Sequence, residues 1–199
     1  MRKSPYFAYS PENNISCMTV FRNPVDRVVS CYYFRFKPKA QLSKLSPDEL
    51  VNVLVHEYSQ YGEGCNNEPV RVLSGYDVEH ELNSPDTPAG WDGIVRASVQ
   101  HMKQCVVFLS EEMHSCHTRV LFKHHFPWLN FTAKRANVNN GRPKNAPLPP
   151  ESIRVIESLN KPELSLYALA QEQYASQIKE LERLGQLKAC QQSDRKSVV

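Results

Sequence analysis

The sequence predicts an α/β fold in a single domain. Two short apolar runs, 15–21 and 105–109, have the length and the β-branched residues of buried strands. Residues typical of a helix start follow each run, and apolar residues recur at helical spacing over much of the remaining chain. A chain of 199 residues with 41% hydrophobic residues can bury one core, so we expect one domain.

The first strand is followed by clear signals of a helix start. Asn23 stands where an N-cap belongs, and Pro24 stands at the first helical position, where a missing N–H costs nothing. From Val25 the apolar residues recur at helical spacing, which predicts a helix to near Phe36. We therefore expect Arg22 beside unpaired backbone N–H groups, an arrangement that favours anions. The alternative is a surface cation at a βα turn.

Another helix start is predicted in the next part of the chain. Ser46 has the place of an N-cap, Pro47 that of the first residue and Glu49 that of a capping-box partner. Its apolar residues predict one buried stripe: Leu50, Val51, Leu54, Val55 and Tyr58. Residues 61–75 predict a loop, with a turn followed by a brief apolar segment.

The second half of the chain also alternates predicted elements with loops. Residues 91–104 predict a helix, and the strand at 105–109 leads to Ser110, which we expect to cap the next helix with two glutamates in its first turn. Residues 130–150 form a long irregular basic region. Helices are predicted over 151–159 and 163–187, and the polar tail, 188–199, is expected to fray.

Composition sets limits on the class of protein. The net charge of +3 is too small to predict nucleic-acid binding. No run reaches the ~18 apolar residues of a membrane helix. Six cysteines are an even count, but a chain of this length need not pair them. Asn14-Ile15-Ser16 and Asn130-Phe131-Thr132 match the N-glycosylation pattern, and Asn130 is the better candidate because Asn14 precedes a predicted buried strand.

Several histidines and cysteines lie close together in the sequence, which raises the question of a zinc site. His114-Ser115-Cys116-His117 lacks a second pair of ligands at a recognised spacing, and strong zinc motifs have two spaced pairs. We therefore expect no metal, and we interpret these histidines as solvated side chains on a helix.

Residues 22–34 read Arg-Asn-Pro-Val-Asp-Arg-Val-Val-Ser-Cys-Tyr-Tyr-Phe. This segment resembles the 3′-phosphate-binding segment of sulfotransferases that use 3′-phosphoadenosine-5′-phosphosulfate (PAPS). It looks most like that of the Golgi polysaccharide O-sulfotransferases, which include the heparan sulfate 2-O- and 6-O-enzymes. Arg22 and Ser30 match the residues that bind the cofactor's 3′-phosphate in that family. Asn23 replaces the usual Asp, and both residues are good helix caps.

Later segments resemble elements of the same family in the same order. The strand and Ser-Glu-Glu of 105–112 look like its Val-Gly-Leu-Thr-Glu-Glu element, which is structural. The helix at 164–174 is similar to its C-terminal Leu-Tyr-x-x-Ala helix, in which Tyr167 would pack rather than react. Asn67 and Arg71 match positions near the acceptor or the cofactor cleft, although Glu68-Pro69 replaces the usual Gln-Thr.

A late basic loop folds over the cofactor in this family. Arg142 and Lys144 lie in the corresponding place, just before the helix at 151–159, and they are the predicted cofactor-binding residues of this region. Lys134 and Arg135 are competing candidates. The alternative is a solvated basic loop without a ligand.

The resemblance implies a P-loop-like sulfotransferase fold, with a parallel sheet flanked by helices. We expect a partial domain, 1–199, that lacks the first βα unit. The family's Gly- and Lys-containing loop, and usually its catalytic base, lie upstream of the Arg-Asp-Pro segment, whereas the first glycine here is Gly62. No catalytic residue is therefore assigned.

The implied activity is transfer of a sulfuryl group from PAPS to a hydroxyl of a polysaccharide or other glycan in the Golgi lumen, with 3′,5′-ADP as product. The alternative is a catalytically inactive fragment that binds a nucleotide or a glycan, or that serves as an interaction module.

Overall fold

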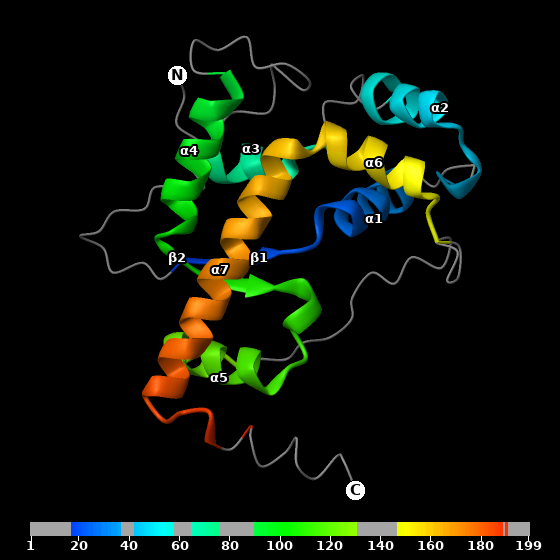
Figure 1. Ribbon diagram of the computed structural model, residues 1–199. Coiled ribbons are helices and arrows are strands. Elements are labelled where there is room, and N and C mark those ends of the chain that lie inside the picture. The colour runs from blue at the N-terminus through cyan, green and yellow to red at the C-terminus, as the bar shows by residue number, and fades with distance from the viewer. Residues whose placement is uncertain are drawn as a thin grey trace, which may run out of the picture.

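The computed structural model describes residues 17–36, 42–57, 65–75, 90–130, 147–188 and 190. Within these residues the architecture is mixed α/β and mostly helical, with a small parallel sheet flanked by helices (Figure 1). The predicted fold class is confirmed at this level.

Two strands form the sheet in the described part of the chain, β1 (Cys17–Phe21) and β2 (Cys105–Leu109). They are parallel, with Cys17 opposite Cys105 and Phe21 opposite Leu109. Both lie within the predicted apolar runs. Because parallel strands need a long crossover, the chain between them passes through α1 (Pro24–Phe36), η3 (Leu42–Lys44), α2 (Pro47–Val51), the π-helical η4 (Asn52–Glu57), α3 (Glu68–Ser74) and α4 (Gly90–Met102).

After β2, every regular element among the described residues is a helix. Its elements are η6 (Ser110–Glu112), α5 (Cys116–His125), α6 (Pro150–Leu159) and α7 (Lys161–Arg183). The helices predicted at 151–159 and 163–187 correspond to α6 and α7. The strands lie near the centre of the described structure, where the long α7 passes across them (Figure 1).

Two hydrophobic clusters stabilise this arrangement. One surrounds the sheet and is closed by α3, α4, α5 and α7; its buried residues include Phe21, Val70, Ile94, Met102, Val107, Phe108, Leu121, Leu166 and Ala170. The other joins α1 to α2 and α6, and includes Val28, Val29, Tyr32, Leu50, Leu54 and Ile156. The apolar faces predicted from helical spacing supply part of both cores, and the strands, α3 and α5 add most of the rest of the cluster around the sheet.

Side chains of α7 bond the edge of β2 that faces away from β1. The amide of Gln177 accepts a hydrogen bond from the Val107 N–H at 3.0 Å and donates one to the Val107 C=O at 2.8 Å. Gln173 donates from Nε2 to the Cys105 C=O at 2.9 Å. An unpaired strand edge can recruit another chain, and these two glutamines occupy that edge instead.

The structure confirms one predicted helix start and corrects another. The Glu49 N–H donates to Ser46 Oγ at 3.3 Å and the Ser46 N–H donates to Glu49 Oε2 at 2.8 Å, which is the predicted capping box. Ser110, however, begins only a short 3₁₀ turn and is not a cap. The helix begins at Cys116, and Ser115 caps it by accepting from the Thr118 N–H at 3.1 Å.

The predicted stripe after the capping box is only partly described. Leu50 and Leu54 are buried and Val51 is half-buried. The side chain of Val55 and all of Tyr58 lie outside the described residues. The regular α-helix ends at Val51, and the chain continues into the π-helical η4.

The predicted loop at 61–75 contains a helix, α3. Asn67 precedes it in a left-handed conformation, with φ of 52°, and Gly75 ends it with φ of 70°. Glycine suits that C-terminal position because it has no Cβ to strain there. Val70 and Leu73 are buried in the cluster that α3 shares with α4. The loop prediction is therefore wrong for 68–74, because tertiary burial stabilises a helix too short to show a clear period.

All six cysteines form disulfides. Cys17 bonds Cys105 directly across the sheet. Cys31 of α1 bonds Cys65 just before α3, and Cys116 of α5 bonds Cys190. Cys190 lies in the stretch that was expected to fray, yet it is fully buried, so the chain is fixed at least as far as this residue. Residues 191–199 lie outside the described part.

Candidate functional site

The carboxyl ends of β1 and β2 lie together at one end of the sheet. We call this end the carboxyl edge of the sheet, and it is the candidate site. Because the strands are parallel and Phe21 lies opposite Leu109, the chain leaves both strands at the same level. Arg22 follows β1 directly, and Ser110 follows β2. Open α/β sheets bind their ligands outside the carboxyl ends of the strands. Arg22 therefore stands where this class of fold binds ligands.

The helix that starts beside Arg22 is capped by its own chain. Asn23 Oδ1 accepts hydrogen bonds from the N–H groups of Val25 at 3.0 Å and Asp26 at 3.3 Å, as its predicted capping role requires. The Arg27 N–H donates to the Asn23 C=O at 2.9 Å, and the first helical residue is a proline without an N–H. The expectation of unpaired N–H groups is therefore wrong, so an anion at this place would depend on side chains.

Arg22 is the side chain best placed to supply a positive charge at this edge. It is half-buried, and no hydrogen bond or ion pair joins it to another residue in the described ranges. Arg27, one turn further along, has its guanidinium occupied by two carboxylates. The donors of Arg22 thus stay available for a ligand while those of Arg27 do not.

Ser30 lies on α1 one turn after Asp26, on the same face of the helix. Its side chain is half-buried, and Asp26 is exposed. Of the two predicted 3′-phosphate residues, Arg22 therefore lies just before α1 and Ser30 lies in the middle of this 13-residue helix. The Asp26 carboxylate accompanies Ser30 on its face of the helix.

Tyr167 of α7 lies at the same edge. Its hydroxyl donates a hydrogen bond to Glu111, which follows Ser110 at the end of β2. Burial raises the pKa of Tyr167 most, the hydrogen bond and charge of Glu111 raise it further, and the charge of Asp26 adds to this. The phenol therefore stays neutral, which agrees with a packing role. The sequence does not predict the pair, because 56 positions separate its members.

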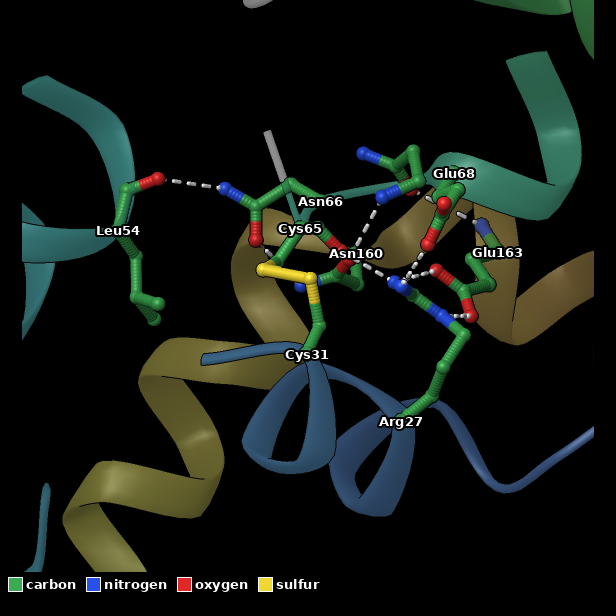
Figure 2. The surroundings of a disulfide bond; sticks show 9 residues. Arg27, Cys31, Leu54, Cys65, Asn66, Glu68, Asn160 and Glu163 are labelled. Atoms are coloured by element: carbon green, nitrogen blue, oxygen red, sulfur yellow. Dashed lines mark hydrogen bonds and ion pairs between the residues drawn. A yellow bond between two sulfur atoms is a disulfide. The ribbon is translucent and has the colours of Figure 1, made fainter. Parts of the chain in front are cut away.

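A second polar cluster surrounds Arg27, in the part of α1 that faces α3 and α7 (Figure 2). Arg27 donates from Nε to Glu163 Oε1 at 2.5 Å, from Nη2 to Glu163 Oε2 at 2.6 Å and from Nη1 to Glu68 Oε2 at 3.0 Å. Nη2 also donates to the C=O of Cys65, whose side chain is disulfide-bonded to Cys31. This cluster links three helices, α1, α3 and α7, and we therefore interpret it as a structural centre that holds them together.

Asn67 belongs to the same structural centre. Its N–H donates to Asn160 Oδ1 at 2.8 Å, its Nδ2 donates to the Leu159 C=O at 2.8 Å, and its Oδ1 accepts from the Glu163 N–H at 3.2 Å. The side chain is buried and ties the start of α3 to the junction of α6 and α7. A contact of the Asn67 side chain with an acceptor, as predicted, would compete with these bonds.

Arg71 lies one turn further along α3 and is also buried. Burial raises the pKa of Glu163, the hydrogen bond and charge of Arg27 oppose this shift, and the charge of Arg71 opposes it as well. Arg71 is therefore near the buried carboxylate. The structure thus groups Asn67 and Arg71 with the Arg27 cluster, whereas Arg22 lies at the edge of the sheet and Ser30 lies on α1.

The late basic loop lies outside the described residues, with all of its candidate cations: Lys134, Arg135, Arg142 and Lys144. Their contribution to a cofactor site remains a prediction.

Metal sites and membrane spans were also sought within the described ranges. No group of three or more His, Cys, Asp or Glu side chains there could hold a metal ion. No described helix combines the length and the apolar character needed to cross a membrane.

Comparison of the whole chain with family models, with curated proteins and with solved structures finds no significant match.

Proposed function

We propose that this chain binds PAPS at the carboxyl edge of β1 and β2, with Arg22 and Ser30 on its 3′-phosphate. The observation that supports this most directly is the Arg22 side chain, which stands at a ligand-binding edge without an ion-pair partner among the described residues. The resemblance of residues 22–34 to a 3′-phosphate segment supplies the identity of the ligand.

The chemistry of the two side chains suits a phosphate. A guanidinium is planar and always charged, and it can bond two phosphate oxygens at once. A serine hydroxyl adds a donor that can rotate toward a third oxygen. Asn23 already satisfies the nearby backbone N–H groups, so Arg22 would provide most of the attraction. Asp26 and Glu111 would oppose an anion placed too close to them.

We further propose a P-loop-like sulfotransferase fold and, as the activity, sulfuryl transfer to a hydroxyl of a polysaccharide or other glycan. When bound, PAPS supplies an activated sulfuryl group. The protein's part in such a reaction is positioning and charge stabilisation. Arg22 and Ser30 would hold one end of the cofactor. No described residue is assigned as the base that accepts the proton of the hydroxyl.

The disulfides support a Golgi location for this activity. Disulfides persist in oxidising compartments such as the secretory pathway and are rare in the cytosol. All six cysteines are paired, and the three bonds link separate elements of the core.

Calorimetry with 3′,5′-ADP and 5′-AMP tests the cofactor site. We expect Arg22→Ala to weaken binding of 3′,5′-ADP at least tenfold, since a charge-assisted contact contributes about 1.5–3 kcal/mol. Binding of 5′-AMP should change little, because it lacks the 3′-phosphate. Arg96→Ala, at an exposed position of α4, is the matched control and should bind as the wild type does. No heat from the wild-type chain, or equal affinities of wild type and Arg22→Ala, would refute the proposal.

A second measurement separates an enzyme from an inactive binding fragment. The chain is incubated with PAPS carrying labelled sulfate and with desulfated heparan sulfate or chondroitin. Transfer of label that Arg22→Ala abolishes supports the enzyme. Binding of 3′,5′-ADP without any transfer supports the fragment.

A further inference from the structure

The turn that follows α5 places an exposed indole beside an N-glycosylation pattern. Asn130 is exposed, and Phe131 and Thr132 complete the pattern in the sequence. Two positions before Asn130, the Trp128 side chain is 67% exposed, and Leu129 between them is 45% exposed. Among the large hydrophobic side chains that the structure describes, the Trp128 indole is the most exposed.

The turn is fixed to the core, so Trp128 is presented in a defined way. The Leu129 N–H donates to the Phe126 C=O at 3.0 Å, which closes the turn. Phe126 is buried in the cluster around the sheet. Its ring meets that of Trp128 at a centroid distance of 6.0 Å and an interplanar angle of 76°. The indole is thus held on one side by Phe126 while most of its surface faces solvent.

We propose that Asn130 carries an N-linked glycan and that the first N-acetylglucosamine packs on Trp128. An N-linked sugar begins at the Asn130 side-chain nitrogen, two positions after the indole and directly after the turn that Leu129 closes. One face of a pyranose ring exposes C–H groups of partial positive charge, which suit the electron-rich face of an indole. The sugar would cover apolar surface that Trp128 now presents to water.

The disulfides supply the second, independent support. N-glycosylation takes place in the endoplasmic reticulum, which is also an oxidising compartment where disulfides form. A chain with all of its cysteines paired is therefore expected to pass through the compartment that modifies Asn130. This inference does not depend on cofactor binding by Arg22.

The modification is tested by expressing the full chain in the secretory pathway of mammalian cells and mapping glycopeptides by mass spectrometry. We expect a glycan at Asn130 that is lost in Asn130→Gln and in Thr132→Ala but kept in Thr132→Ser, which preserves the hydroxyl. A chain that enters the pathway with Asn130 unmodified would overturn the inference. Free thiols in the folded chain would overturn its premise.

The packing is tested on glycoprotein trimmed to a single N-acetylglucosamine at each site. The same protein with its glycans removed completely is the reference, and Asn14→Gln excludes an effect from the other pattern. We expect the single sugar to raise the melting temperature by about 2–4 °C. That gain should disappear in Trp128→Ala and persist in the matched variant Leu129→Ala. An equal gain with and without the indole would overturn the packing on Trp128.

Discussion

Arg27 joins segments that lie far apart in the sequence. Its guanidinium bonds both oxygens of Glu163, which is 136 positions away, and one oxygen of Glu68. Glu163 is only 1% exposed, and a buried carboxylate without a partner costs several kcal/mol. Movement of α7 against α1 would break this pair, so the two charges specify the packing of the helices as well as contributing to stability.

Replacement of Arg27 should therefore be far more costly than replacement of an exposed arginine. We expect Arg27→Met to lower the free energy of unfolding by about 3–5 kcal/mol, because it leaves Glu163 buried without its main partner. Arg183→Met removes a pair with Glu180 whose side chains are 70% and 52% exposed, and it should change stability little because solvent screens an exposed ion pair. Urea unfolding measures both. Similar losses in the two variants would contradict the structural role of Arg27.

Glu163 also makes stability depend on pH. Burial raises its pKa above 4.5 in the folded chain, so the folded state binds the proton more readily than the unfolded state. The contribution of Glu163 to stability is therefore greatest at low pH and falls as the pH rises through the interval above 4.5. We expect the stability of wild type minus that of Glu163→Gln to fall over this interval. Glu172→Gln, on the exposed face of α7, controls for the loss of one charge. If the difference between wild type and Glu163→Gln rises with pH instead, the pKa of Glu163 is lowered in the folded chain and the prediction is wrong.

At the scale of single elements, the two glutamines of α7 act as a substitute for a neighbouring strand. Gln177 pairs with both the N–H and the C=O of Val107, as a strand backbone would. Val107 is fully buried, so water cannot replace these bonds. The helix thereby closes one side of the sheet without adding a strand.

The Gln177→Leu variant tests this closure. It should lower the free energy of unfolding by about 2–4 kcal/mol, because two buried backbone groups lose their partners at about 1–3 kcal/mol each and the added apolar side chain offsets part of the loss. Gln100→Leu, at an exposed position of α4, is the matched control and should change stability by less than about 0.5 kcal/mol. Denaturant unfolding compares them, and light scattering shows whether the unpaired edge promotes association.

Elements with strong local signals could be predicted from the sequence. The capping box at Ser46 and the cap and proline at the start of α1 lie within a few residues of the bonds they make, so the sequence shows them directly. The same signals misled at Ser110, because Ser115 lies only a turn away and also has the chemistry of a cap. Local chemistry alone does not decide between two such candidates.

Features that depend on distant residues could not be predicted. Helix α3 is short, and its stability comes from burial of Val70 and Leu73 rather than from its own period. The bonds of Arg27 and the pair of Tyr167 with Glu111 join residues that only the fold brings together. At the candidate site, the sequence predicted the place of Arg22 and the Asn23 cap, but not that this cap and Pro24 together leave no unpaired helix N–H beside Arg22.

At the scale of the whole molecule, the disulfides cover the described structure from its first strand to its last residue. One bond joins the two strands, one joins α1 to Cys65, just before α3, and one joins α5 to Cys190. Each loop they close is long, with separations of 88, 34 and 74 residues. In the chain-entropy view, each such bond contributes about 4 kcal/mol by restricting the unfolded chain.

The order of these bonds along the chain has a consequence for biosynthesis. Cys31 and Cys65 pair inside the loop that Cys17 and Cys105 close, so two cysteines that follow one another in the sequence, Cys17 and Cys31, are not partners. A bond between Cys17 and Cys31 that forms early has to be exchanged by thiolate attack before the native pairs can form. We expect recovery of the reduced, unfolded chain to take minutes to hours in oxidant alone and to speed up severalfold with a disulfide isomerase. When the chain is unfolded in urea with its disulfides intact, the rate of refolding should not change on addition of the isomerase. An equal acceleration by the isomerase in both experiments would contradict this route.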